Sequence, residues 1–183
     1  QKGIDVCLLH RTHRTGYKAG ALAAGLPQAK GDFIAIFDAD FIPRTDFLLR
    51  TLPYFSDNSV GMVQARWEHL NRHHSLLTEI SAVMLDGHFV LEHSARYHND
   101  LFFNFNGTAG VWRKSCINDA GGWSSDTITE DLDISYRAQL LGWRFIYLKN
   151  YVVPAEVPAN MQAFLAQQFR WAKGAIQVAQ KML

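Results

Sequence analysis

Two aspartates, Asp38 and Asp40, lie one residue apart directly after an apolar run in this sequence of 183 residues. Carboxylate oxygens are the ligands that hard cations such as Mg²⁺ or Mn²⁺ prefer, and a nucleotide diphosphate can supply further oxygens. A cation held there would neutralise the charge that develops on a leaving diphosphate. A surface turn with two solvated aspartates explains the same spacing, so the pair needs support from other residues.

A second candidate group is the run Thr129-Glu130-Asp131, which precedes a helical pattern. A carboxylate in the first turn of a helix often serves only as a cap, because the helix dipole favours negative charge there. In the functional interpretation, Asp131 is a general base that takes a proton from an acceptor hydroxyl. The dipole is then expected to keep the pKa of Asp131 low, so that the carboxylate is ionised at neutral pH.

The third group is Gln167, Arg170 and Trp171, whose spacing places them on one face of a helix. An amide, a cation and an indole on one face suit a diphosphate beside a sugar ring. The alternative is an amphipathic helix whose tryptophan belongs to the core. However, a separate apolar face is already available at Leu165, Phe169, Ala172 and Ile176.

Hydrophobic periodicity predicts the elements that must position these groups. We expect strands at residues 4–9, 33–37, 60–66, 108–112 and 143–148. We expect helices at residues 18–26, 45–55, 75–95, 130–141 and 159–182, and a short helix that ends at Gly121. This alternation predicts one α/β domain with a mostly parallel sheet flanked by helices. In such sheets ligands bind beyond the carboxyl ends of the strands, which is where Asp38 and Asp40 are expected.

The composition narrows the function classes. Hydrophobic residues make up 48% and charged residues 19%, as in globular domains. The formal net charge of +1, without a cluster of five Lys or Arg residues, argues against nucleic acid as a partner. No run of about 18 apolar residues occurs, so no membrane-spanning helix is expected within this stretch.

Taken in order, three motifs resemble the signature of the processive family 2 glycosyltransferases, which include cellulose synthases, mannan synthases and their bacterial relatives. These motifs are Asp38-Ala39-Asp40, Thr129-Glu130-Asp131 and the Gln-x-x-Arg-Trp pattern that ends at Trp171. Lys18-Ala19-Gly20 resembles the family's segment near the nucleotide, and Phe105-Asn106-Gly107-Thr108 resembles its acceptor-site loop. Gly121-Gly122-Trp123 precedes the second motif, as in the family. The resemblance extends over nearly the whole chain.

The resemblance implies a GT-A-type fold for nucleotide-diphospho-sugar transfer and an inverting single displacement. A hexosyl unit would pass from a nucleotide-sugar to the end of a β-linked polysaccharide, with Mg²⁺ or Mn²⁺ as cofactor. The implied metal ligands are Asp38 and Asp40, and the implied base is Asp131 with Glu130 beside it. The implied nucleotide-sugar contacts are Lys18, Asp38 and Arg170. The implied acceptor contacts are Gly107, Thr108, Gln167 and Trp171.

Members of this family usually carry an earlier strand and helix, with an aspartate that contacts the nucleotide base, and membrane helices on both sides. By that resemblance, residues 1–183 are expected to be an N-terminally truncated part of the catalytic domain. The membrane segments would lie outside this chain, with the catalytic domain on the cytoplasmic side. The isolated chain is therefore expected to be a poor enzyme, and its oligomeric state stays open.

The donor and two competing functions also remain open. The run that begins at Phe105 looks more like mannan synthases than cellulose synthases, which leaves GDP-mannose and UDP-glucose as donors. A haloacid-dehalogenase-like phosphatase also places Asp-x-Asp after a buried strand, but it usually has Thr or Val where Ile42 stands. A non-catalytic sugar-binding module derived from the transferase would need Trp171 but not Asp131.

Overall fold

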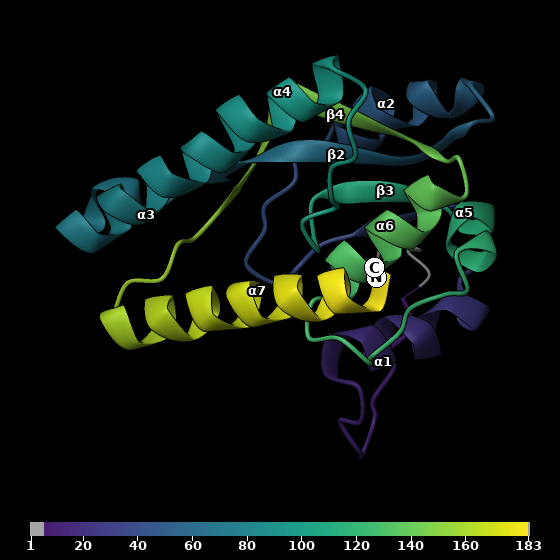
Figure 1. Ribbon diagram of the computed structural model, residues 1–183, viewed down its shortest axis with the longest axis horizontal. Helices are drawn as coiled ribbons and strands as arrows, with labels where there is room; N and C mark the ends of the chain where they lie inside the picture. The colour runs from purple at the N-terminus through teal and green to yellow at the C-terminus, as the bar shows by residue number, and fades with distance from the viewer. Residues whose placement is uncertain (1–5, 183) are drawn as a thin grey trace.

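Four strands form a single sheet in the computed structural model, which describes residues 6–182. In spatial order they are β1 (Phe33–Ile36), β3 (Gly110–Arg113), β2 (Val60–His69) and β4 (Arg144–Ala155). Helices surround the sheet, and the long helix α7 (Met161–Met182) runs beside α6 (Glu130–Leu140) (Figure 1). The predicted α/β class is confirmed.

Strand direction differs from the expectation at one position. Strand β2 pairs parallel with β4, but β3 pairs antiparallel with both β1 and β2. Three of the four strands described therefore run the same way, as expected for a mostly parallel sheet, but the reversed β3 makes two of their three pairings antiparallel. A short apolar strand buried on both faces has the same pattern in either direction, and the sequence cannot reveal the reversal.

Of the two helices before the second strand, the first has the predicted length and the second is shorter than predicted. Helix α1 (Tyr17–Gly25) continues into the 3₁₀ turn η1 (Leu26–Gln28). The helix expected at residues 45–55 divides into α2 (Phe47–Thr51) and a 3₁₀ segment, η2 (Leu52–Ser56). Pro53 lies in the first turn of η2 and lacks the N–H that would continue the α-helical bonding.

The helix predicted at residues 75–95 forms one continuous rod with a widened middle. After the 3₁₀ turn η3 (Arg72–His74), a capping box between Ser75 and Thr78 begins α3 (Leu76–Asp86). The rod continues as a π-helical segment, η4 (Gly87–His93), and ends in α4 (Ser94–His98). Its second half packs along β4.

The core has two halves, one on each face of the sheet. On one face α2 and η2 contribute Phe47 and Phe55. On the other, α5 (Lys114–Asp119) and α6 contribute Ile117 and Ile134. There Trp112 of β3 is fully buried, and its ring contacts Phe105, Trp123 and Phe145 at centroid distances of 5.6, 5.8 and 5.3 Å. This aromatic cluster supports the loop that precedes β3.

The strand predicted at residues 4–9 is wrong where the structure describes it. Residues 6–9 have no strand structure, and Val6 and Leu8 are 81% and 88% exposed. Ile4 and Asp5 lie outside the described residues. An alternating apolar pattern forms a strand only where a neighbouring strand pairs with it, and none of the four strands does so here. Over residues 6–182, none of the helices combines the length and apolarity that a bilayer crossing requires.

Candidate active site

Three predicted site residues meet at one end of the sheet. Asp38 follows β1 and Thr108 precedes β3, and the antiparallel pairing of these strands brings the two residues together. The backbone N–H of Asp38 donates to Thr108 Oγ1 over 2.9 Å. Lys18, from the first turn of α1, forms an ion pair with the Asp38 carboxylate. Residues that are 90 positions apart along the chain thus form one polar cluster.

Gly107 joins this cluster to the start of α6. Its backbone has a φ of +81°, a conformation that glycine adopts without a steric penalty. A Cβ atom at Gly107 would lie 3.1 Å from Asp131 Oδ2 and 3.5 Å from Lys18 Nζ. The loop therefore passes directly over the Asp131 carboxylate, and a larger residue would crowd it.

Asp131 lies in the first turn of α6, where the backbone N–H of Leu132 donates to its Oδ1 over 2.9 Å. Burial, together with the negative charge of Glu130, raises the pKa of Asp131 to about 7. The expectation that the helix dipole keeps this pKa low is wrong. The loss of hydration outweighs the hydrogen bond from Leu132 and the positive charge of Lys18, both of which favour the carboxylate.

Glu130 shares the same electrostatic environment. Burial raises the pKa of Glu130, and the charge of Asp38 acts in the same direction. The positive charges of Lys18 and Arg170 oppose this rise. Arg170 is exposed on α7 and acts on the cluster through its charge. Charged residues of the other two predicted motifs therefore affect the pKa of Glu130, although the motifs lie on different elements.

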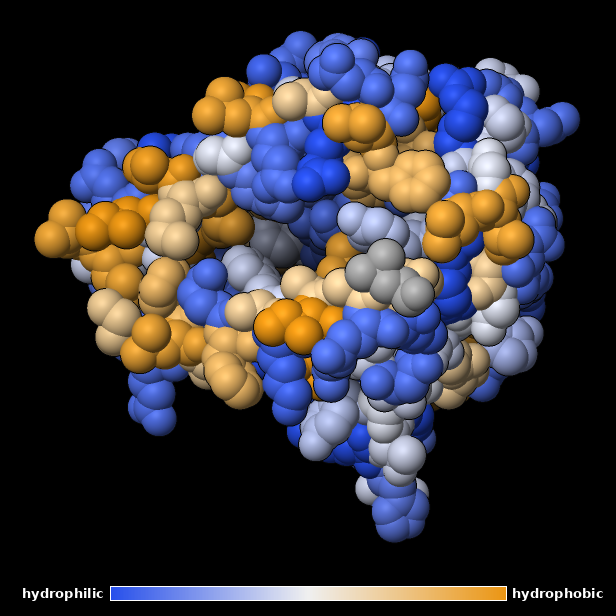
Figure 2. All heavy atoms as spheres, in the orientation of Figure 1, coloured by the Kyte–Doolittle hydropathy of each residue, from blue (hydrophilic) through white to orange (hydrophobic). Residues whose placement is uncertain are grey.

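A cavity of about 810 Å³ opens beside Asp131. Asp131, Gln167 and Trp171 all line it, so the base candidate shares one space with two of the acceptor candidates. It lies between the rod of α3 and η4 and the helix α7, and Figure 2 shows it as a hollow with apolar side chains on its rims. Its apolar lining includes Met84, Leu85, Phe89, Phe102, Phe164 and Val178.

One wall of the cavity is polar and was not anticipated from the sequence. His88 Nδ1 lies 2.9 Å from Glu92 Oε2, and Asn106 Nδ2 lies 3.1 Å from His88 Nε2. All three residues line the cavity. The only sequence signal was the i, i+4 spacing of His88 and Glu92, which many solvated helices share.

The two-aspartate site has a donor set that fits a hard cation. The Asp38 carboxylate is paired with the Lys18 ammonium, so a metal ion there would have to share the carboxylate with the lysine or displace it. Asp40 is exposed two residues further on. Within residues 6–182 no group of three His, Cys, Asp or Glu side chains is arranged to hold a metal. Asp38 and Asp40 would therefore need further oxygens from a ligand or water to complete a coordination sphere.

Comparisons with known proteins identify the family of this chain. A family model described as glycosyltransferase like family 2 matches residues 2–174. Glucomannan 4-beta-mannosyltransferase 1 of Oryza sativa subsp. japonica is 45% identical over 186 aligned residues, which cover all of this chain and 36% of that protein. Glucomannan 4-beta-mannosyltransferase 9 of Arabidopsis thaliana is 44% identical, with 99% of this chain and 35% of that protein covered. The chain thus spans about a third of the length of these curated relatives.

A solved structure shares the fold. It is a mannosyltransferase from Pyrobaculum calidifontis in complex with GDP-Man and Mn²⁺, and it superposes with a TM-score of 0.73. The superposition covers 96% of this chain and 46% of that chain, at 22% sequence identity.

Proposed function

Because this chain belongs to the glycosyltransferase-like family 2 and has the GT-A-type fold, we propose that it carries the active site of an inverting hexosyltransferase. The donor is a nucleotide-sugar, and the acceptor is the end of a β-linked polysaccharide. This membership leaves no support for the phosphatase alternative, which explains neither Asp131 nor Trp171.

Asp131 is the proposed base. It takes the proton of an acceptor hydroxyl as that oxygen attacks the anomeric carbon of the donor. The new glycosidic bond forms while the bond between that carbon and the diphosphate oxygen breaks, and the nucleoside diphosphate leaves with its electron pair. A base is most effective when its pKa lies near the working pH, and a pKa of about 7 meets that condition.

The leaving diphosphate is proposed to lie on the side of Lys18 and Asp38. Lys18 and the exposed Arg170 supply positive charge near Glu130 and Asp131. A divalent cation held by Asp38 and Asp40 would supply further charge neutralisation for the diphosphate. The Mn²⁺ of the Pyrobaculum structure supports a divalent metal, and Mg²⁺ is the alternative to test.

The acceptor is proposed to lie in the cavity of about 810 Å³. Trp171 offers an indole face to the apolar C–H face of a sugar ring, and Gln167 offers an amide to its hydroxyls. Both lie on the cavity wall, as does Asp131. Gly107 leaves the space over Asp131 that an acceptor hydroxyl needs.

The proposed donor is GDP-mannose and the proposed acceptor is a β-linked mannan or glucomannan chain. Support comes from the relatives named glucomannan 4-beta-mannosyltransferases and from the GDP-Man bound to the Pyrobaculum enzyme. UDP-glucose is the second donor to test. We also propose that the whole protein works at a membrane, because apolar side chains such as Leu76, Ile80, Leu165 and Phe169 are exposed on α3 and α7. The cytoplasmic side is proposed from the family resemblance alone.

One observation carries the catalytic proposal: a carboxylate with a pKa of about 7 faces the same cavity as Trp171. A sugar-binding module would need the tryptophan but not this carboxylate.

The test is a donor screen on the full-length protein in membranes, with GDP-mannose or UDP-glucose and with Mn²⁺ or Mg²⁺. Mannosyl transfer is expected, and Asp131→Asn should reduce it by about 10²- to 10⁴-fold. Asp119→Asn makes the same change at an exposed carboxylate on α5 and should have no effect. Full activity in Asp131→Asn would contradict the mechanism.

A further inference from the structure

A buried carboxylate lies two residues beyond the proposed base. Asp133 is fully buried on α6, although a buried charge is costly unless it is paired. Arg137, one turn further along α6, donates to Asp133 Oδ2 from Nη2 over 2.7 Å and from Nε over 2.9 Å. The same guanidinium donates to the carbonyl oxygens of Ala120 and Gly122. Asp133 and Arg137 thus connect α6 to the loop that leads into it.

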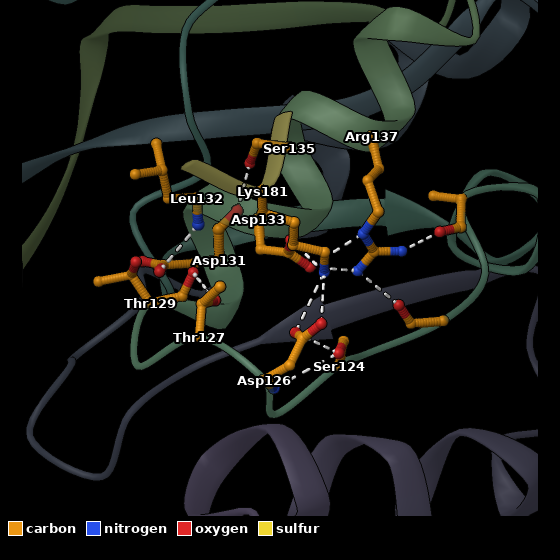
Figure 3. Close-up of polar contacts among 12 residues, drawn as sticks. Ser124, Asp126, Thr127, Thr129, Asp131, Leu132, Asp133, Ser135, Arg137 and Lys181 are labelled. Carbon is orange, nitrogen blue, oxygen red and sulfur yellow. Dashed lines mark hydrogen bonds and ion pairs between the residues drawn. The ribbon is translucent and has the colours of Figure 1, made fainter. Parts of the chain in front are cut away.

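A second cation reaches Asp133 from a distant element. Lys181 Nζ, near the end of α7, lies 2.7 Å from Asp133 Oδ1 and 2.9 Å from Asp126 Oδ2. Figure 3 shows Asp126, Asp133, Arg137 and Lys181 converging. Because Asp133 has a cation on each oxygen, it is the one carboxylate in this group that joins α6 to α7.

Helix α7 also contacts the segment that precedes Asp131. The Gln177 amide oxygen accepts a hydrogen bond from the backbone N–H of Ile128 over 3.0 Å. Gly174 approaches Thr129 so closely that a Cβ atom there would lie 2.3 Å from Thr129 Cγ2. Helix α7 is therefore seated on residues before and after the proposed base.

Helical geometry links these contacts to the acceptor residues. Gln167, Trp171, Gly174, Val178 and Lys181 recur at intervals of four, three, four and three residues, which defines one face of α7. Gly174 and Val178 are buried on that face. Trp171 lies ten residues before Lys181, or roughly 15 Å along a straight helix. Fixing Lys181 on Asp133 thus fixes where Gln167 and Trp171 stand relative to Asp131.

We propose that Asp133, together with Lys181 and Arg137, positions the acceptor for transfer. This inference rests on the proposed function of the same site. The three charged side chains fix the position of α7 along α6 and its rotation about its own axis. An acceptor terminus that packs against Trp171 then lies next to the Asp131 carboxylate. None of the three touches the reacting atoms, and their effect is carried entirely through the placement of α7.

The test uses Lys181→Met in the full-length protein, with Lys173→Met as the control because Lys173 is an exposed lysine of the same helix. Two reactions are measured on each variant: transfer to the glycan and hydrolysis of the donor by water. Water needs no placement against Trp171. Since a displacement of about 1 Å can cost about 100-fold in rate, transfer should fall about 10- to 100-fold in Lys181→Met. Donor hydrolysis should stay within about threefold of the wild type, and Lys181→Arg should restore most of the transfer.

Hydrogen exchange supplies a readout that does not depend on the reaction. The amides of residues 172–182 should exchange faster in Lys181→Met than in Lys173→Met, because this half of α7 loses its ion pairs with Asp126 and Asp133. An unchanged ratio of transfer to hydrolysis, an equal loss of both reactions, or unchanged exchange would each overturn the positioning role. If the wild-type protein showed no glycosyl transfer while hydrogen exchange still differed between the two variants, the proposed function would be wrong. The placement of α7 on α6 by Lys181 would still stand.

Discussion

The pKa of Asp131 connects the chemistry of this site to pH at the level of a single residue. As the proposed base, Asp131 must be ionised to accept a proton, and burial with the charge of Glu130 raises its pKa to about 7. We expect kcat/KM to rise with pH through about 7 and to level off above it. Glu130→Gln removes the neighbouring negative charge, so the midpoint should move to lower pH. Initial rates across the neutral range measure both curves, and a midpoint that rises in Glu130→Gln would contradict this account.

The same pKa predicts that Asp131 weakens the fold at neutral pH. The pKa of an aspartate is near 3.8 in an unfolded chain and about 7 here, so between these values the folded state binds more protons than the unfolded state. Stability from this group is therefore present below about pH 4 and is lost as pH rises through about 7. Asp131→Asn should melt at a higher temperature than the wild type at pH 8, and at about the same temperature at pH 4. Thermal melts without divalent cations test this, and a variant that melts lower at pH 8 would oppose it.

For single residues, the sequence predicted which residues belong to the site better than it predicted their surroundings. Asp38, Thr108 and Lys18 were each placed in the site from their motifs, and the structure joins them directly. The pKa of Asp131 was predicted in the wrong direction, because a helix start can be seen in a sequence but the removal of water cannot. The polar wall at His88 and Asn106 depends on the cavity and had no distinctive pattern.

At the level of elements, substitution by alanine is expected to have opposite effects on stability at two glycines, one in α7 where it meets the start of α6 and one in the long rod. A Cβ atom at Gly174 would overlap Thr129, whereas at Gly87, in the middle of the long rod, it would meet nothing within 4 Å. Gly174→Ala should therefore destabilise the protein by about 1–3 kcal/mol through overpacking. Gly87→Ala should stabilise it by about 0.5–1 kcal/mol, because alanine is the better helix former.

Denaturant unfolding of the two glycine variants measures these free energies. Adding Thr129→Ala to Gly174→Ala should recover only part of the loss, because it removes the methyl and hydroxyl groups at 2.3 and 2.4 Å but keeps the Cβ atom at 2.8 Å. A Gly174→Ala protein as stable as the wild type would mean that α7 is not seated as described.

Element boundaries could be predicted where local chemistry decides them. Gly142, with a φ of +92°, ends α6 as expected, and Ser75 begins α3 through its capping box. The break at Pro53 and the π-helical segment were missed. The direction of β3 was also missed, because it depends on how the preceding residues return to the sheet.

At the scale of the whole molecule, the exposed apolar residues of α7 predict an orientation on a membrane. Leu165 and Phe169 are 57% and 66% exposed on the face turned away from α6. Replacing both with Glu should reduce the fraction that sediments with lipid vesicles several-fold, because apolar area at a bilayer surface drives such binding. Leu49→Glu changes a residue of α2 that is 78% exposed and should leave sedimentation unchanged. Equal losses in both proteins would argue against an orientation set by α7.

The overall fold could be predicted from three short motifs in order, through their family resemblance. The cavity could not, because it is enclosed by η4, α6 and α7, which have no sequence feature in common. Which residues lie on one helix face can be predicted from spacing, but which face meets another helix depends on contacts such as that of Lys181 with Asp133, 48 residues apart.

The ion pair between Lys18 and Asp38 gives the site a counter-ion that belongs to the chain itself. In the proposed function, a metal ion held by Asp38 and a bound diphosphate would exchange partners with this ion pair, and the Lys18 ammonium would turn from the carboxylate to the phosphate. A chelator should accordingly abolish transfer while leaving the melting temperature within about 1–2 °C, since the lysine keeps Asp38 paired. In Lys18→Met the same treatment should lower the melting temperature, because nothing would replace the lost cation. A chelator that unfolds the wild type would show that the built-in counter-ion does not suffice.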